Sequence, residues 1–300
     1  MSFNKNNTPM RYNNLGGTGL IVSEFSFGCM TFSNGHGTAG NVQTPEAYKL
    51  MKTCFENGIN FFDNAEAYGG PGTSEIIMGE AVQLGLKDGV WGREDLVIST
   101  KIFFGGRGKK DTINSLGLSR KHLYEGLKAS LKRMQLEYVD LVFCHRPDPR
   151  TPIEETVRGM NNLIDRGMAF YWGTSEWSAR QLQEAKDIAK RLGLVQPFFD
   201  QCQYNMTVRD RVEVEYRPLY PELGLTIWSP LAGGVLTGKY AKGGTGKFYS
   251  PKPAVDVLSL TCRSFIRYAP RYQSGSSKWF DDFWISADDG KNWCMNGDKM

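Results

Sequence analysis

Four residues that can move or hold protons stand at or near the ends of three consecutive apolar segments. Asp63, Lys101 and His145 each end such a segment or directly follow it, and Tyr68 lies five residues beyond Asp63. A tyrosine hydroxyl can donate a proton to a carbonyl oxygen, and an imidazole can hydrogen-bond the same oxygen. These residue types in this order indicate proton delivery to a carbonyl group.

The tyrosine poses a pKa problem, because a free tyrosine titrates near 10 and donates poorly at neutral pH. A neighbouring ammonium, here Lys101, is expected to stabilise the phenolate and lower the pKa of Tyr68. Asp63 would keep that ammonium charged and oriented. Each residue alone also has a structural explanation: an ion pair, a structural imidazole or a loop-capping tyrosine. The ordered set favours a functional site.

The elements that position these residues alternate along the chain. Apolar, strand-like runs cover residues 25–28, 59–63, 96–101, 139–145, 169–174, 198–203 and 225–229. Segments with helical spacing lie between or after them, at residues 45–57, 74–87, 119–136, 153–166, 178–192 and 209–222. Strands and helices that alternate with short connections predict a parallel sheet covered by helices.

Two architectures satisfy this pattern, an open doubly wound sheet and a closed barrel. No phosphate-binding glycine fingerprint follows the first strand, and polar residues gather after many successive strands, so the pattern favours an α/β fold of the (β/α)8 TIM barrel type. Residues 10–22 hold two short apolar runs around a glycine-rich turn. An extended run follows these glycines, which favours an N-terminal β-hairpin over a dinucleotide-binding loop.

The C-terminal part of the chain departs from this rhythm. Seven strands are recognisable before residue 240, whereas a (β/α)8 barrel needs eight. Residues 254–260 are a weak candidate for the eighth strand, and no amphipathic helix follows them. We therefore expect a barrel that is incomplete or atypical at its C-terminal end. The predicted division is a disordered N-terminus at 1–9, a barrel at 10–240 and an atypical tail at 241–300.

Composition narrows the possible functions. The 300 residues carry 36 Lys and Arg against 32 Asp and Glu, and a formal net charge of +4 gives no reason to expect nucleic acid as a partner. No apolar run is long enough for membrane insertion, and the polar N-terminus does not resemble a signal peptide, so we expect a cytoplasmic protein. Six scattered cysteines and three histidines give neither disulfide nor metal-site spacing.

Several motifs carry a resemblance to a known family. They are Asp63-x4-Tyr68-Gly69, Lys101, His145-Arg146-Pro147-Asp148, Trp172-Gly173-Thr174-Ser175 and Trp228-Ser229-Pro230-Leu231. Over residues 10–240 the chain resembles the aldo-keto reductase superfamily, in the branch of the voltage-gated potassium channel β subunits and their fungal and plant relatives. The resemblance implies a (β/α)8 barrel that binds NADPH or NADP at the C-terminal ends of its strands.

The resemblance also implies roles for individual residues. Asp63, Tyr68, Lys101 and His145 match the catalytic tetrad, with Tyr68 as general acid. Ser175 and Gln201 match residues that hold the nicotinamide carboxamide, and Trp228 matches the residue that stacks on its ring. The full set of implied cofactor-binding residues is Gly28, Cys29, Met30, Asp63, Ser175, Gln201, Trp228, Ser229, Leu231 and Lys239.

Three hypotheses follow for the function. The first is an oxidoreductase that transfers a hydride from NADPH to a small aldehyde or ketone. The second is a regulatory β-type subunit that binds NADPH and associates with a potassium channel or forms a homo-oligomer. The third is a truncated, non-catalytic isoform, because the family's last barrel unit, which grips the adenosine 2′-phosphate, is not recognisable after Lys239. His145, where some channel-associated members carry Asn, favours the first hypothesis.

Overall fold

Seven parallel strands and one antiparallel strand close into a barrel. The structure, a computed structural model, describes residues 10–34, 41–237, 265–268, 285–288 and 292–295. The parallel strands pair in chain order and are β3 (Phe25–Gly28), β4 (Phe61–Asp63), β5 (Val97–Ile102), β6 (Val139–Cys144), β7 (Ala169–Ser175), β8 (Phe199–Gln203) and β9 (Gly224–Trp228). The predicted parallel α/β barrel is confirmed.

The barrel closes in an unusual way. Strand β10 (Phe265–Tyr268) pairs antiparallel with both β9 and β3, so it occupies the eighth position with reversed direction. The C-terminal end is therefore atypical, as expected, although the ring is closed rather than open. The predicted candidate strand at residues 254–260 lies outside the described residues.

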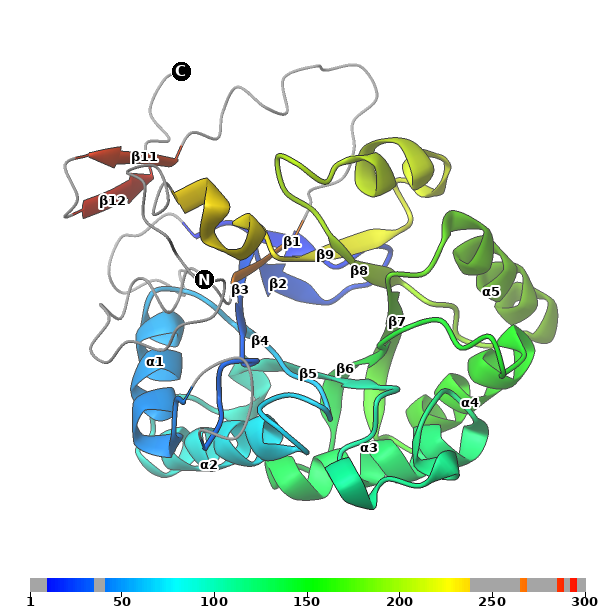
Figure 1. Ribbon diagram of the computed structural model, residues 1–300, viewed down its shortest axis with the longest axis horizontal. Coiled ribbons are helices and arrows are strands. Elements are labelled where there is room, and N and C mark those ends of the chain that lie inside the picture. Colours follow the sequence, from blue (N-terminus) through cyan, green and yellow to red (C-terminus); the bar gives the residue numbers. More distant parts are fainter. Residues whose placement is uncertain (1–9, 35–40, 238–264, 269–284, 289–291, 296–300) are drawn as a thin grey trace. The chain divides into compact units, whose positions relative to one another are not determined.

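In the described part of the chain, five α-helices lie on the outside of the parallel strands (Figure 1). They are α1 (Thr44–Glu56), α2 (Thr73–Lys87), α3 (Arg120–Met134), α4 (Ile153–Asp165) and α5 (Ala179–Leu192). Helix α5 shows how the local sequence sets its bounds. The backbone N–H of Gln181 donates to the Ser178 hydroxyl at its start, and Gly193 ends it in the left-handed conformation. Its buried residues Leu182, Ala185 and Ala189 recur at helical spacing and face the barrel.

The helix predicted at residues 209–222 is wrong. The structure has a five-residue π-helix at Arg211–Glu215 and a 3-10 turn at Arg217–Leu219 instead. Pro218 and Pro221 lack backbone N–H groups and therefore interrupt a regular helix. This irregular segment between β8 and β9 buries Tyr216 completely.

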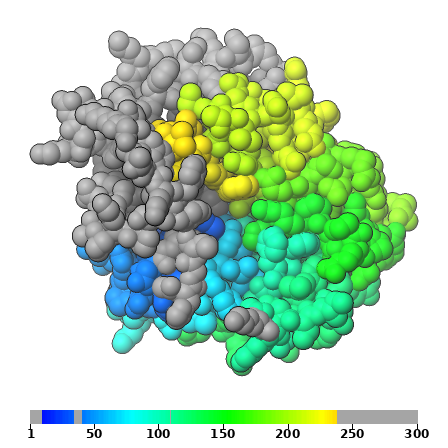
Figure 2. All heavy atoms as spheres, viewed as in Figure 1, coloured from blue at the N-terminus to red at the C-terminus, as the bar shows by residue number. Residues whose placement is uncertain are grey.

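Apolar side chains fill the inside of the barrel. Phe61, Val97, Leu141, Phe143 and Phe199 form this inner cluster together with Leu15 and Val22 of the N-terminal hairpin. Figure 2 shows the same face of the molecule with all heavy atoms as spheres. Gly173 on β7 is required by this packing, since a Cβ there would lie 2.1 Å from the Phe199 ring.

The N-terminal hairpin is confirmed. Strands β1 (Tyr12–Asn14) and β2 (Ile21–Ser23) pair antiparallel, and the Tyr12 hydroxyl donates to the carbonyl of Gly58 at 2.7 Å. A second unit, Arg271–Met300, contains the antiparallel pair β11 (Ile285–Asp288) and β12 (Asn292–Met295). Among the described residues, no helix combines the length and apolar character that a membrane span requires.

Candidate active site

Asp63 and Lys101 form a buried ion pair at the C-terminal ends of β4 and β5. The register places Asp63 opposite Ser99, and Lys101 lies two residues further on the same face of β5. The Lys101 Nζ lies 2.5 Å from Asp63 Oδ2, and neither side chain is more than 1 % exposed. The same nitrogen donates to the carbonyl of Asn64 at 2.7 Å and to the Tyr68 hydroxyl at 3.3 Å. All three ammonium donors therefore have acceptors.

This pairing makes a fully buried lysine tolerable, because an unpaired buried charge is strongly destabilising. Burial by itself lowers the pKa of Lys101, but the Asp63 carboxylate and the Tyr68 hydroxyl more than offset it, and the net pKa is raised. Ser99 donates to the second oxygen of Asp63 at 2.7 Å. The raised pKa keeps the Lys101 ammonium charged at neutral pH.

Tyr68 reaches this pair from the loop after β4. Burial raises its pKa, and Lys101 lowers it by a smaller amount, so the net pKa lies above 10. The expectation that the pKa of Tyr68 lies below its ordinary value is wrong for this structure, because the sequence shows the nearby charges but not the burial. Tyr68 therefore keeps its proton at neutral pH, and Lys101 reduces the cost of losing it.

His145 follows β6 and packs between two aromatic rings. Its ring centroid lies 5.7 Å from that of Tyr68 and 4.9 Å from that of Phe104, both edge-on. Burial, with the nearby charges of Lys101 and Arg146, holds its pKa well below 6.5, so the imidazole is neutral. Its Nδ1 is buried and has no hydrogen-bond partner in the described part of the chain. A buried ring nitrogen without a partner is a feature of ligand-binding sites.

The residues expected to hold a carboxamide lie on β7 and β8. Ser175 stands opposite Gln201 in the register, and its hydroxyl donates to the Gln201 carbonyl at 2.8 Å. The Ser175 Oγ in turn accepts from Arg146 Nη1 at 3.0 Å. The amide nitrogen of Gln201 lies 3.4 Å from Asp63 Oδ1. The Gln201 amide thus connects the β7–β8 edge to the Asp63–Lys101 pair.

Trp228, at the end of β9, is held by a carboxylate that the sequence motifs did not reveal. Its indole N–H donates to Glu176 Oε1 at 2.9 Å. The same oxygen accepts from the backbone of Gln203 at 2.7 Å, and Oε2 accepts from Arg211 at 2.8 Å. Glu176 has a left-handed φ of 60°. The only sequence signal for it is a carboxylate directly after a strand end.

A second carboxylate, that of Asp200, forms hydrogen bonds at the same β7–β9 edge. Asp200 on β8 is fully buried and accepts from Thr174 at 2.6 Å and from Tyr216 at 3.0 Å. The Tyr216 hydroxyl also contacts the carbonyl of Trp177. Burial is the main cause that raises the pKa of Asp200 to about 6. Sequence reasoning missed this network because Tyr216 belongs to the irregular segment that had been predicted to be helical.

The remaining predicted residues flank these groups. Gly28 ends β3, Cys29 donates its backbone N–H to the Asp63 carbonyl at 2.8 Å, and Met30 is 45 % exposed. Ser229 follows β9 with φ 56°, and Asn205 donates to its carbonyl at 3.0 Å. A non-glycine residue held at positive φ is a feature that clusters at ligand sites.

Two further predicted residues lie beyond Ser229. Leu231 precedes the turn Ala232–Thr237, and Lys239 lies outside the described residues. The structure therefore brings the four residues predicted as a tetrad together, and the residues predicted to bind a cofactor that it describes lie mostly along β3 and β7–β9.

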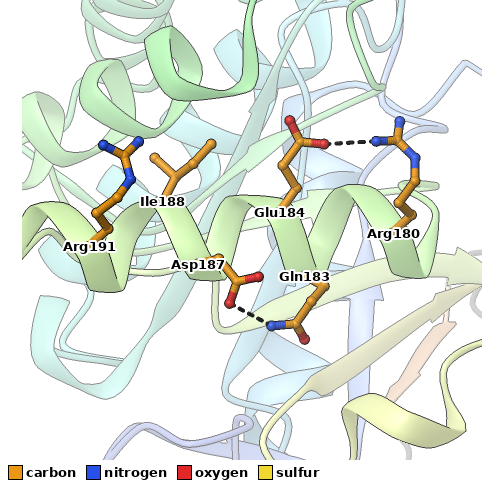
Figure 3. A pocket seen from close by; sticks show the side chains of 6 residues that line it. All are labelled: Arg180, Gln183, Glu184, Asp187, Ile188 and Arg191. Carbon is orange, nitrogen blue, oxygen red and sulfur yellow. Dashed lines mark hydrogen bonds and ion pairs between the residues drawn. The ribbon is translucent and has the colours of Figure 1, made fainter.

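A separate pocket lies on the outer face of α5 and shares no residue with this site. Its lining side chains all come from that helix: Arg180, Gln183, Glu184, Asp187, Ile188 and Arg191 (Figure 3). Arg180 pairs with Glu184 at 2.8 Å, and Gln183 donates to Asp187 at 2.8 Å. These polar groups satisfy one another, as is usual on a solvated helix face.

Comparison with known proteins agrees with this description. Residues 24–274 match the sequence profile of the family described as "Aldo/keto reductase family". A rice protein (Oryza sativa subsp. japonica) named "Probable voltage-gated potassium channel subunit beta" is 55 % identical over 237 residues, which cover 78 % of this chain and 68 % of the relative. A protein of the same name from Arabidopsis thaliana is 56 % identical over 238 residues, with the same coverage.

Proposed function

The chain belongs to the aldo/keto reductase family, and on this premise we propose that it is an oxidoreductase that reduces an aldehyde or ketone with NADPH. The observation that carries the proposal is the buried Lys101–Asp63 pair with the Tyr68 hydroxyl 3.3 Å from the ammonium. A protonated tyrosine beside a buried cation suits delivery of a proton to a carbonyl oxygen. Members of this family generally use NAD(P)H.

The described residues fit a nicotinamide cofactor. The Ser175 hydroxyl donates to the Gln201 backbone carbonyl and accepts from Arg146. Its oxygen therefore has one lone pair left, which can accept from the N–H of a carboxamide. The indole of Trp228, held by Glu176, offers a flat face to an aromatic ring. Such a cofactor supplies the hydride that adds to the carbonyl carbon.

The tetrad residues then have distinct roles. Tyr68 donates its proton to the carbonyl oxygen, and Lys101 stabilises the phenolate that remains. Asp63 keeps the ammonium charged and fixed in place. The neutral His145 donates a ring N–H to the carbonyl oxygen and so orients it. Each of these groups acts within one connected set of contacts.

Titration of the purified protein with NADPH, followed by cofactor and tryptophan fluorescence, tests the proposal. Saturable quenching that weakens in a Trp228→Phe variant is the expected result. A carbonyl screen with the saturated protein should then show oxidation of NADPH. A folded protein that binds no NADPH would contradict the proposal and favour the hypothesis of a non-catalytic isoform.

The two plant relatives motivate a second proposal. Their names describe probable voltage-gated potassium channel β subunits, and more than half of the aligned residues are identical to this chain over more than 230 positions. We propose that this protein also associates with the cytosolic face of a potassium channel as a homo-oligomer. Co-purification with a channel and a stable tetramer are the expected results. A monomer that turns over steadily and captures no channel would contradict this second function.

A further inference from the structure

Arg146 is a cation at the active site without a carboxylate partner. Among the described residues, no Asp or Glu oxygen forms an ion pair with it. The two other cations of the site are neutralised, Lys101 by Asp63 at 2.5 Å and Arg211 by Glu176 at 2.8 Å. Arg146 is therefore a cation of the site that no described carboxylate neutralises through an ion pair.

The contacts of Arg146 place this charge against the catalytic groups. Its Nη1 donates to the His145 carbonyl at 2.5 Å and to the Ser175 hydroxyl at 3.0 Å. The centre of the guanidinium lies 6.0 Å from the centroid of the Phe104 ring. Arg146 thus belongs to one wall with Phe104 and His145, and the His145 ring continues this wall to Tyr68.

Phe104 gives the wall an apolar face. It is 46 % exposed, which is unusual for a phenylalanine, and its ring packs edge-on against His145 at 4.9 Å. Its backbone lies in the loop after β5, where the neighbouring N–H groups of Phe103 and Gly105 donate to the buried Glu66 at 2.7 and 2.9 Å. The loop that carries this ring is therefore fixed by a buried carboxylate.

A partly buried guanidinium attracts a negative charge more strongly than an exposed one, because less water screens it. In the described part of the chain, the hydrogen bonds of the Arg146 guanidinium use Nη1 alone. Guanidinium has five N–H donors whose geometry matches a carboxylate. A substrate with both a carbonyl and an anionic group would satisfy Tyr68 and Arg146 together.

We infer that Arg146 selects carbonyl substrates that also carry a carboxylate, with Phe104 covering the apolar part between the two groups. The inference deepens the proposed function and rests on it, since it names the substrate class of the same site. A role for Arg146 confined to ordering Ser175, or to binding the cofactor, is the alternative that the experiment must separate.

The test uses two substrates with the same reacting aldehyde, 4-carboxybenzaldehyde and its neutral methyl ester. We expect the wild-type protein to have the higher kcat/KM for the acid. In Arg146→Gln the acid-to-ester ratio of kcat/KM should fall about tenfold or more, since a hydrogen bond between charged groups is lost only for the acid. Arg146→Lys keeps the charge and should retain part of the preference.

Arg150→Gln is the matched control, because it removes a positive charge from the same loop. The Arg150 side chain is 66 % exposed and lies 3.8 Å from Asp148. Its variant should leave the acid-to-ester ratio unchanged. Equal losses for the two substrates in Arg146→Gln would overturn the inference, and so would a weakened NADPH affinity with an unchanged ratio.

A binding measurement keeps this inference separate from the proposed function. If the wild-type protein reduces neither substrate, the binding of both compounds to it and to Arg146→Gln is measured by calorimetry. Tighter binding of the acid that Arg146→Gln abolishes supports the inference although the reductase proposal fails. Equal binding of acid and ester by the wild-type protein overturns it.

Discussion

The two halves of the candidate active site are held in place by different means. On β4 and β5, Asp63 and Lys101 neutralise each other, and their further contacts come largely from the same strands and the loop between them. On β7–β9, the carboxylates of Glu176 and Asp200 reach outward, to Arg211 and Tyr216 in the irregular segment after β8. We call the β4–β5 side, with Asp63 and Lys101, the proton half, and the β7–β9 side, with Glu176 and Asp200, the stacking half.

The difference teaches where each half is vulnerable. The proton half depends on a charge pair that is almost wholly removed from water, so losing one partner should affect both stability and chemistry. The stacking half depends on side chains outside the barrel strands, so changes in the segment 205–220 should weaken cofactor binding while the proton half stays intact. The following variants test this separation.

The largest effect is expected from Lys101→Met. It leaves the Asp63 carboxylate buried without its cation, which should lower the free energy of unfolding by about 3–5 kcal/mol. Urea unfolding at pH 7.5 measures this loss. The double variant Asp63→Asn with Lys101→Met should recover most of the stability, since no unpaired charge remains. A single variant as stable as the wild-type protein would show that the pair does not hold the proton half.

Asp200→Asn tests the brace of the stacking half. The raised pKa of about 6 means that the folded protein binds the proton more tightly than the unfolded chain does. Asp200 therefore contributes stability below its ordinary pKa of 3.8, and this contribution is lost as the pH rises through about 6. Above that pH the buried carboxylate costs about 3 kcal/mol.

Asn cannot ionise, and its amide can donate to the Tyr216 hydroxyl, which in turn donates to the Trp177 carbonyl. The stability of Asp200→Asn relative to the wild-type protein should therefore rise between pH 4 and pH 7, by at most about 3 kcal/mol. Chemical unfolding at several pH values measures the difference. A difference that stays constant across this range would contradict the assignment.

Glu176 tests whether the stacking half serves the cofactor. Glu176→Ala removes the acceptor of the Trp228 indole and the partner of Arg211, and we expect NADPH affinity to fall about tenfold. Glu176→Gln keeps an acceptor oxygen for the indole and should lose less. Fluorescence titration gives the Kd, and near-ultraviolet circular dichroism reports the tryptophan environment. Equal Kd values for both variants would show that the hydrogen bond from the Trp228 indole to Glu176 does not contribute to NADPH affinity.

Titration of His145 should not affect the dependence of kcat/KM on pH in the neutral range. Because its pKa lies well below 6.5, the imidazole stays neutral across the neutral range, and kcat/KM should show no inflection near 6.5. Stopped-flow or steady-state rates between pH 6 and pH 8 measure this. An inflection near 6.5 that disappears in His145→Asn would mean that the ring titrates there.

The proton half could be predicted from the sequence, and the physical reason is the regularity of strands. Asp63 and Lys101 stand at the ends of apolar runs that form parallel strands. Because the ends of such strands lie at the same edge of the sheet, the contact between the two side chains can be predicted without knowing the loops. The direction of the Tyr68 pKa could not be predicted in the same way, because it depends on how much water the fold excludes from the hydroxyl.

The stacking half was less predictable, because the residues that hold it lie in irregular segments that show no regular sequence pattern. Arg211 and Tyr216 belong to a segment with helical spacing that prolines prevent from forming a regular helix. Glu176, directly after β7, itself has a left-handed backbone conformation, which its residue type does not indicate. The reversed strand β10 is a third example, since strand direction is set by tertiary pairing and not by the local residues.

The central claim is that Tyr68 supplies the proton, and single-turnover oxidation of bound NADPH by Tyr68→Phe tests it most directly. The variant keeps the ring and loses only the hydroxyl that lies 3.3 Å from Lys101. We expect the rate to fall about 10²- to 10⁴-fold, while the Kd for NADPH stays at the wild-type value. A rate equal to that of the wild-type protein would contradict the assignment of Tyr68 as the general acid.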